Sequence, residues 1–272
     1  MNFTYNNWDR FCEAISAYNT ILGKDIPLNS ESSWLVIKHD VETNPKKALE
    51  LARIESKYGL RCTYYVQGDL VERYAATLQT IAKLGHEVTY HYDVLDANSG
   101  NMQEALKEFN MYLNSFKRLG LQVKSICPHG NPMLNRSGWD SNRDFFMDEH
   151  IRALFPDIFD IVLDTPSSTV GGYTYVSDAG YGFKRIKNIS TGKNQDVDES
   201  DVIVDFEGLK AVIDGNSKVI ISTHPHRWFK SSTYFKFRLF VFFIIRKLVG
   251  YFSRFYIVKR LLSSLYKFAR RF

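Results

Sequence analysis

The chain has 272 residues, of which 44% are hydrophobic, enough to bury the core of one large domain or of two modest ones. Its three cysteines, Cys12, Cys62 and Cys127, are odd in number and widely spaced, which argues against a disulfide framework and against a zinc site of the Cys-x-x-Cys kind. The net charge of +5 conceals an asymmetry, because eleven Lys and Arg and no acidic residue follow position 229, leaving 24 Lys and Arg against 30 Asp and Glu before it.

This charge distribution divides the chain into two predicted units. We expect residues 1–230 to form one catalytic domain and residues 231–272 to form a basic tail. Positive charge confined to a terminal segment argues against nucleic acid as a partner of the folded domain. The first residues, MNFTYNNWDRFCEAISAY, contain neither a basic leader nor a long apolar stretch, so we expect a cytoplasmic protein.

Patterns typical of buried strands alternate with helix-forming stretches along the predicted domain. The expected strands are 34–39, 62–67, 87–91, 123–127, 159–163, 173–177, 202–205 and 219–223. Residues 45–58 and 104–119 have helical spacing, and Asn44 precedes the first as a plausible cap. This alternation predicts parallel strands that can close an α/β barrel. Residues 131–157 and 180–201, with many Gly, Asn, Ser and Asp, are expected to be long loops over the strand ends.

Six of the seven histidines lie in four short segments at or beside the ends of expected strands: KHDVE, GHEVTYH, CPHGNP and STHPH. The carboxyl ends of barrel strands meet at one rim, so these segments predict a single polar site. Imidazole and carboxylate together suit a divalent metal such as zinc, and also suit proton transfer near neutral pH. The sequence therefore predicts a hydrolytic enzyme. His86, which opens its strand, and His150, in a helix-like stretch, are expected to lie outside the site.

These segments resemble the motifs of the polysaccharide deacetylase family (NodB homology) over roughly residues 34–228. The motifs HDVE, HYD, CPHGNP, YVSDA and HPHRW are most similar to a divergent subgroup that contains HDVD and HGNP. The resemblance implies a distorted (β/α) barrel of the polysaccharide deacetylase type, which removes acyl groups from sugars with a divalent metal. It also implies that Asp40 and His91 are metal ligands.

The chain departs from the family pattern at several positions. Leu95 stands where the family has a second ligand histidine, and we infer that His129, in place of a loop tyrosine, supplies the third ligand to a metal expected to be zinc. His39 stands at the position of the catalytic base, and Ile126 at that of the arginine that orients this base. We therefore expect His39 to be the base or an outer ligand, although a bound metal could also activate water without it.

The resemblance also implies the groups that act on the departing amine. His224 matches the histidine that protonates the amine, and Asp178 matches the aspartate that orients this histidine. The backbone amide of Gly130 or Asn131 is expected to stabilise the oxyanion. Three further side chains, Glu42, Asp93 and His226, are expected to orient ligands or contact substrate; the alternative for Glu42 and Asp93 is contact with solvent.

Two functions of different classes fit these residues. The first is a metal-dependent hydrolase that removes an N-acetyl or N-formyl group from a sugar of a glycan or of a lipid-linked glycan precursor. The alternative is a catalytically inactive glycan-binding or scaffolding protein at a membrane surface, because Leu95 and Ile126 replace two working groups of the family. A third interpretation, a phosphoesterase, would require more cationic or metal-binding groups near the strand ends than the sequence offers.

Residues 232–272 are rich in aromatic and basic side chains. The longest charge-free apolar run covers residues 239–245, well below the ~20 residues that a spanning helix needs. On a helix, one apolar stripe contains Phe240, Ile244, Leu248, Tyr251, Phe255, Val258, Leu262 and Tyr266. This pattern predicts a helix lying on an anionic membrane, and hence a peripheral protein of the inner membrane. The alternative is a helix that packs on the barrel or on a second subunit.

Overall fold

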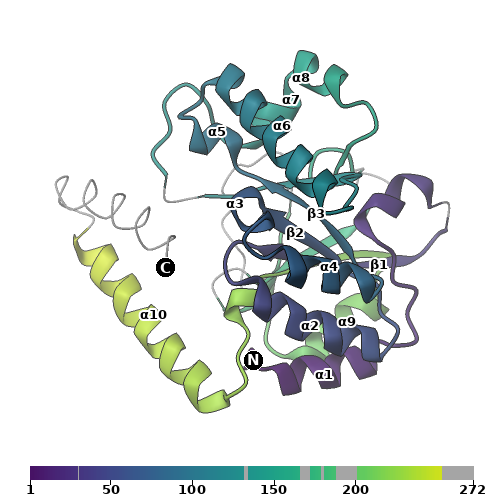
Figure 1. Cartoon of the computed structure of the whole chain (residues 1–272). Coiled ribbons are helices and arrows are strands. Elements are labelled where there is room, and N and C mark those ends of the chain that lie inside the picture. Colours follow the sequence, from purple (N-terminus) through teal and green to yellow (C-terminus); the bar gives the residue numbers. More distant parts are fainter. Residues whose placement is uncertain (30, 132–133, 166–171, 179–180, 188–200, 253–272) are drawn as a thin grey trace.

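A computed structural model describes residues 1–29, 31–131, 134–165, 172–178, 181–187 and 201–252 (Figure 1). Within these residues, nine strands form one sheet in the order β5-β4-β3-β2-β1-β9-β6-β7-β8. The strands are β1 (Trp34–Val41), β2 (Thr63–Gln67), β3 (Glu87–Tyr92), β4 (Ser125–Pro128), β5 (Phe159–Asp160), β6 (Thr174–Ser177), β7 (Phe183–Arg185), β8 (Val202–Ile203) and β9 (Lys218–Thr223). All pairs from β5 to β6 are parallel, whereas β6, β7 and β8 pair antiparallel.

The predicted fold class is confirmed: the chain is an α/β protein with a mostly parallel sheet, and the sheet is that of a distorted barrel. Each of the eight expected strands overlaps an observed one. In the part of the chain that is described, β5 and β8 form the two edges of the sheet, so the barrel is open there. Strand β7 lies in a stretch that we expected to be a loop. It has three residues, of which Phe183 alone is buried, too few to give a periodic signal.

Helices cover the sheet. In chain order they are α1 (Tyr5–Ala14), α2 (Pro45–Lys57), α3 (Gly68–Val71), α4 (Ala75–Lys83), α5 (Val94–Ala97), α6 (Met102–Arg118), α7 (Arg143–Met147), α8 (Glu149–Leu154), α9 (Phe206–Asp214) and α10 (Ser232–Phe252). Helices α1, α2, α4 and α9 lie together on one side of the molecule, and α10 projects away from its body (Figure 1).

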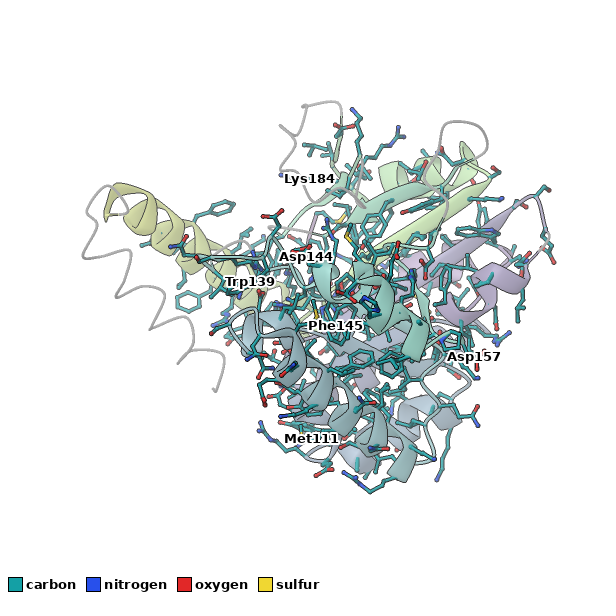
Figure 2. All side chains as sticks on the ribbon, turned by 90° about the horizontal axis from the view of Figure 1, so that it is seen from above. Met111, Trp139, Asp144, Phe145, Asp157 and Lys184 are labelled. Carbon is teal, nitrogen blue, oxygen red and sulfur yellow. The ribbon has the colours of Figure 1, made fainter. Side chains whose placement is uncertain are left out.

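Two local predictions about helices and loops need correction or refinement. The expected loop at residues 131–157 contains α7 and α8, which are short and are held by buried apolar side chains. One of these, Phe145, lies within the mass of side chains, whereas Met111 and Asp157 lie at the periphery (Figure 2). Asn44 does precede α2, but its side chain makes no capping hydrogen bond and its backbone is left-handed, with φ 38°.

The two faces of β1 enter different environments, although all eight of its residues are buried. Leu35 and Ile37 pack in the large core between the sheet and the helices, whereas Trp34 and Val36 pack in a smaller core inside the barrel. Because successive side chains of a strand alternate between faces, the polar residues at the end of β1 separate in the same way. Position 39 belongs to the helix-facing set, and positions 38 and 40 belong to the interior set.

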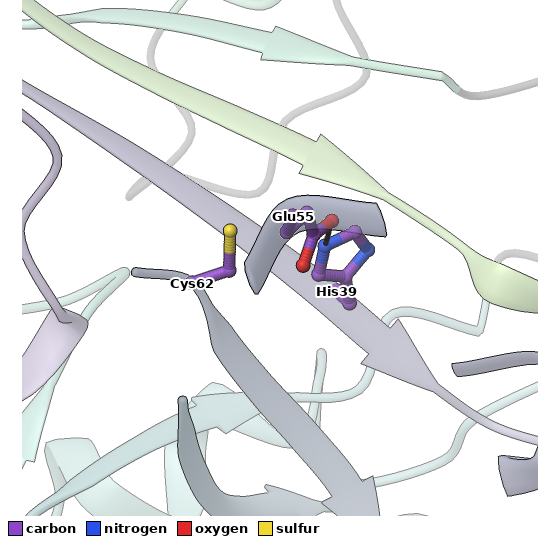
Figure 3. A group of neighbouring side chains, drawn as sticks. All are labelled: His39, Glu55 and Cys62. Carbon is purple, nitrogen blue, oxygen red and sulfur yellow. Dashed lines mark hydrogen bonds and ion pairs between the residues drawn. The ribbon is translucent and has the colours of Figure 1, made fainter. Parts of the chain in front are cut away.

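A buried carboxylate, Glu55 of α2, joins the helix layer to the sheet (Figure 3). Its oxygens accept hydrogen bonds from His39 Nε2 at 2.7 Å, Trp8 Nε1 at 2.9 Å and the Tyr64 hydroxyl at 2.5 Å. Burial alone would raise the pKa of Glu55, but the charge and hydrogen bond of His39 outweigh it and lower the pKa to about 2. The network therefore holds an ionised carboxylate among α1, α2, β1 and β2.

This network predicts a specific dependence of stability on pH. Because the pKa of Glu55 falls from 4.5 to about 2 on folding, its stabilisation is complete above pH 4.5 and is lost as the pH falls towards 2. The difference in unfolding free energy between the wild type and Glu55→Gln should therefore shrink over this interval, as measured by urea denaturation at stepped pH. Glu50→Gln, on the exposed face of the same helix, is the matched control. A difference that stays constant with pH would contradict the assignment.

Candidate active site

Five side chains meet at the carboxyl ends of four strands of the sheet. Asp40 and Glu42 come from the interior face of β1 and its continuation, His91 from β3, and His129 and His224 from the residues that follow β4 and β9. His129 Nε2 lies 3.2 Å from Glu42 Oε1, and the rings of His91 and His129 are 5.2 Å apart. His224 Nε2 lies 3.7 Å from Glu42 Oε1 and 3.9 Å from Asp40 Oδ2. The structure thus brings the four predicted residues Asp40, His91, His129 and His224 together.

His39 is not part of this cluster, and its predicted role as base or outer ligand is corrected. It lies on the helix-facing side of β1, fully buried against Glu55, with its ring stacked on Tyr64 at 4.3 Å. Pairing of β1 with β9 continues without a bulge through His39 and Thr223, so adjacent side chains must point to opposite faces. His39 therefore stabilises the fold and cannot take a proton from a water molecule at the rim.

A buried ion pair underlies the cluster, and the sequence analysis missed it. The Lys38 Nζ atom donates hydrogen bonds to both oxygens of Asp40, at 2.6 and 2.7 Å, and lies 3.4 Å from Cys127 Sγ. The Ser222 hydroxyl donates a further bond to Asp40 at 3.2 Å. Burial would raise the pKa of Asp40, but Lys38 overcomes this effect and lowers the pKa to about 2. The signal was available, because Lys38 lies two residues before Asp40 on the same face of the strand.

Two groups of donor atoms overlap at His91. In the inner group, Asp40, His91 and Cys127 have ligand atoms within 4.8 Å of one another. Both oxygens of Asp40 already bind the Lys38 ammonium, and burial raises the pKa of the Cys127 thiol. A cation at the inner group would meet one resident positive charge and a protonated sulfur, so the inner group does not fit a divalent metal.

The outer group contains Glu42, His91 and His129, again with ligand atoms within 4.8 Å of one another. His91 Nδ1 donates to the Cys127 carbonyl at 3.0 Å, which leaves the Nε2 lone pair for an ion. Burial lowers the pKa of His91 to about 4, so the ring is neutral at pH 7. One carboxylate and two imidazoles are a donor set that zinc accepts. The carboxylate of this outer group is Glu42, which was expected to orient a ligand, contact substrate or face solvent, and not Asp40.

His224 lies against Asp178, in the arrangement that the sequence predicts. Its Nδ1 is 2.5 Å from Asp178 Oδ1, and the same carboxylate accepts hydrogen bonds from Thr223 Oγ1 at 2.7 Å and Arg227 Nη1 at 2.7 Å. Burial opposes ionisation of Asp178, but Arg227 and His224 hold its pKa well below the ordinary value. An Nδ1–H bond to this carboxylate orients the ring so that Nε2 faces Glu42. The catalytic roles of the two residues remain predictions.

The other predicted residues lie around this centre. His226 is next to His224, with ring centroids 5.6 Å apart, and burial lowers its pKa to about 4. Gly130 is exposed, Asn131 is buried, and Asp93 precedes α5 in a half-buried position. Oxyanion binding by the amides of Gly130 or Asn131 is untested by this geometry.

Two features outside the motifs support the rim. The loop after β4 is held at His129, whose backbone N–H donates to the Tyr92 carbonyl at 2.8 Å and whose carbonyl accepts from Asn142 at 2.9 Å. No local pattern marked Asn142, because it lies thirteen positions along the chain from its partner His129. The two replaced family positions, Leu95 and Ile126, are both buried in the large core. His86 and His150 lie outside the site, as expected: His86 bonds the Ala52 carbonyl, and His150 is exposed on α8.

Comparison with solved structures places polysaccharide deacetylases among the proteins to which this chain is similar. Peptidoglycan deacetylase PdaC from Bacillus subtilis has 13% identity and a TM-score of 0.39, over 82% of this chain and 97% of that chain. A family 4 carbohydrate esterase from Streptomyces lividans has 12% identity and a TM-score of 0.42, over 74% of this chain and 82% of that one. The catalytic domain of peptidoglycan N-acetylglucosamine deacetylase from Eubacterium rectale has 12% identity and a TM-score of 0.42, over 73% and 82%. No family model and no curated protein matches.

The buried ion pair gives a prediction for stability. Replacing Lys38 with Met leaves the Asp40 charge buried without its cation, which should lower the unfolding free energy by about 3–5 kcal/mol. The double variant Lys38→Met/Asp40→Asn removes both charges and should recover at least about 1 kcal/mol of this loss. Chemical denaturation of the three proteins measures both values. Equal stability of the single and double variants would contradict the ion pair.

Proposed function

We propose that the chain is a metal-dependent deacylase that removes an N-acetyl or N-formyl group from a sugar of a glycan or glycan precursor. The observation that carries this proposal is the outer group of Glu42, His91 and His129, with His224 Nε2 only 3.7 Å from Glu42. A candidate metal-binding group, together with His224 as a neighbouring imidazole outside that group, provides an ion to activate water and a group to transfer protons, which amide hydrolysis requires. The motif resemblance supports a sugar as the substrate.

The outer group would hold the ion, with zinc as the proposed metal. When bound, such an ion lowers the pKa of a coordinated water from about 15.7 to about 7 and polarises the acyl carbonyl. Glu42 contributes the negative charge, because the hydrogen bond from His129 overcomes the effect of burial and keeps the pKa of Glu42 well below its ordinary value. His91 would contribute a neutral nitrogen donor, and His129 would contribute the nitrogen that now donates to Glu42, with the ion replacing its proton. The amide of Gly130 or Asn131 would stabilise the oxyanion from the adjoining loop.

Proton transfer falls to His224, since His39 is on the opposite face of β1. Water oxygen attacks the acyl carbon, and His224 Nε2 takes the proton that this water releases. The carbon–nitrogen bond then breaks, and the same nitrogen of His224 delivers the proton to the departing amine. Asp178 stabilises the ring through Nδ1 while it carries the extra charge. The products are a carboxylic acid and a free amino sugar. His224 gains one proton and gives one proton back, so it ends the reaction in its starting state.

A second function, a catalytically inactive glycan-binding protein, is favoured by one observation. Lys38 already neutralises Asp40, the residue that the family resemblance marks as a metal ligand. If the outer group does not bind an ion either, the rim would be a polar sugar-binding surface without hydrolytic power. Metal content therefore separates the two functions.

The outer group predicts the metal stoichiometry. The purified wild type should hold one zinc per chain by elemental analysis, and dialysis against a chelator should remove the zinc together with the activity. His91→Ala and His129→Ala should each lose the zinc, whereas His150→Ala, an exposed histidine on α8, should retain it. A wild type without metal that still binds glycan would establish the binding protein instead.

The role of His224 predicts a different phenotype. His224→Gln removes the group that moves the proton but none of the proposed ligands, so zinc content should stay at the wild-type level. Release of amine from N-acetylated and N-formylated sugars should fall by about 10²–10⁴-fold in kcat. His150→Gln, which changes an exposed histidine on α8 outside the site, serves as the control and should retain the wild-type kcat. Unchanged kcat in the His224 variant would exclude it as the proton donor.

A further inference from the structure

The first turn of α10 is anchored in the domain, whereas most of the described side chains beyond it, up to residue 244, are exposed. Phe235 is fully buried and packs against Phe3, Tyr181 and Phe229, with ring centroids 5.9 to 6.3 Å apart. Large apolar side chains farther along remain uncovered, with exposed fractions of 60% for Phe237, 64% for Phe240, 47% for Phe243 and 42% for Ile244. A projecting helix that exposes this much aromatic surface indicates a binding partner that covers it.

The charge of the segment favours a lipid surface as that binding partner. Residues 230–272 contain eleven Lys and Arg and no acidic residue, and Lys236 and Arg238 are exposed beside the apolar side chains. Two such helices packed together would bring like charges into contact, whereas anionic headgroups complement them. No helix in the described part of the chain is long and apolar enough to span a bilayer. A helix that lies on the surface satisfies both observations.

Phe240 and Ile244 belong to the stripe that the sequence predicts, and both are exposed. The remaining members of that stripe, Leu248, Tyr251, Phe255, Val258, Leu262 and Tyr266, have side chains outside the described residues. Phe237 extends the stripe by one turn towards the domain, because it precedes Phe240 by three residues. The apolar surface therefore begins close to the body of the protein.

The link between the candidate site and α10 is short and firmly held. Five residues lie between His226 and Ser232, the first residue of α10, a span of at most about 20 Å. Lys47 Nζ donates hydrogen bonds to the carbonyls of His226 and Trp228, both at 2.8 Å, and lies 3.7 Å from the centre of the Phe229 ring. A lipid-bound α10 would therefore keep the site rim close to the membrane surface.

From these observations we propose that α10 binds an anionic lipid surface, as part of a peripheral protein on the inner face of a membrane, and that the site acts there on the acylated sugar of a lipid-linked glycan precursor. This inference rests on the proposed deacylase function and names its substrate class. A sugar held by a lipid anchor shares the plane to which α10 confines the rim, so its local concentration is raised without any additional contact to the sugar.

The test compares one acylated sugar in two forms: an N-acetylglucosaminyl lipid in vesicles of phosphatidylcholine and phosphatidylglycerol, and a water-soluble methyl N-acetylglucosaminide. The wild type should sediment with these vesicles but not with pure phosphatidylcholine, and kcat/KM should be at least tenfold higher for the lipid form. The variant Phe237→Glu/Phe240→Glu should lose sedimentation and this preference while retaining activity on the soluble sugar. Met111→Glu/Leu154→Glu, at exposed apolar positions on α6 and α8, should behave like the wild type.

The possible failures are distinguishable. Equal kcat/KM for the two forms, or vesicle binding unchanged in the α10 variant, would overturn the inference and leave the deacylase function intact. A second copy of the chain would be identified as the binding partner if the wild type self-associates in analytical ultracentrifugation, the α10 variant does not, and neither sediments with vesicles. This result would also overturn the inference. Absence of amine release from both forms would refute the deacylase function. Vesicle sedimentation would still test whether α10 binds an anionic lipid surface.

Discussion

The two-residue alternation of β1 determines which polar side chains can share a site. It sends Lys38, Asp40 and, beyond the strand, Glu42 into the barrel, and it sends His39 towards the helices. Unbroken pairing with β9 through His39 prevents any local bulge from relaxing this rule. Lys38, His39 and Asp40 each then need a partner on their own face, because all three side chains are buried.

The partners on the two faces have different consequences. On the helix side, Glu55 provides His39 with a carboxylate, and the result is a fully buried network that stabilises the fold. On the interior side, Lys38 provides Asp40 with an ammonium, so the inner carboxylate has its cation before any metal arrives. The next interior carboxylate, Glu42, lies two residues farther along and faces only imidazoles. In the proposed metal site, the carboxylate ligand is therefore Glu42, which lies farther out along the strand and closer to solvent than Asp40.

Much of this arrangement could be predicted from the sequence. The strand ends were marked by His91, His129 and His224, because parallel strands place their carboxyl ends on one rim whatever the details of the loops. The pairing of Asp178 with His224 followed from motif resemblance. Side-chain directions and tertiary partners were not predicted correctly. His39 was assigned to the site because it stands at the position of the family's catalytic base, although a period of two places it on the other face.

Other features gave no local signal at all. Strand β7 exists because β6 and β8 offer it partners, and its three residues have no pattern of their own. Helices α7 and α8 form in a stretch of polar residues because Phe145, Phe146 and Ile151 have a core to enter. Asn142 supports the His129 loop from within this same stretch. Tertiary burial, rather than local propensity, decides these elements.

One turn, η4 (Pro225–Arg227), serves both the site and the tail. Arg227 of this turn binds Asp178, which orients His224, while the carbonyls of His226 and Trp228 bind Lys47 and hold the start of the chain that leads to α10. Changes within η4 would therefore disturb proton transfer and tail attachment together. Phe237 and Phe240 lie beyond Phe235, the last buried side chain of the described segment, so changes there leave Asp178 and His224 in place. The boundary between the proposed catalytic and lipid-binding parts lies at this anchor and not at the first basic residue.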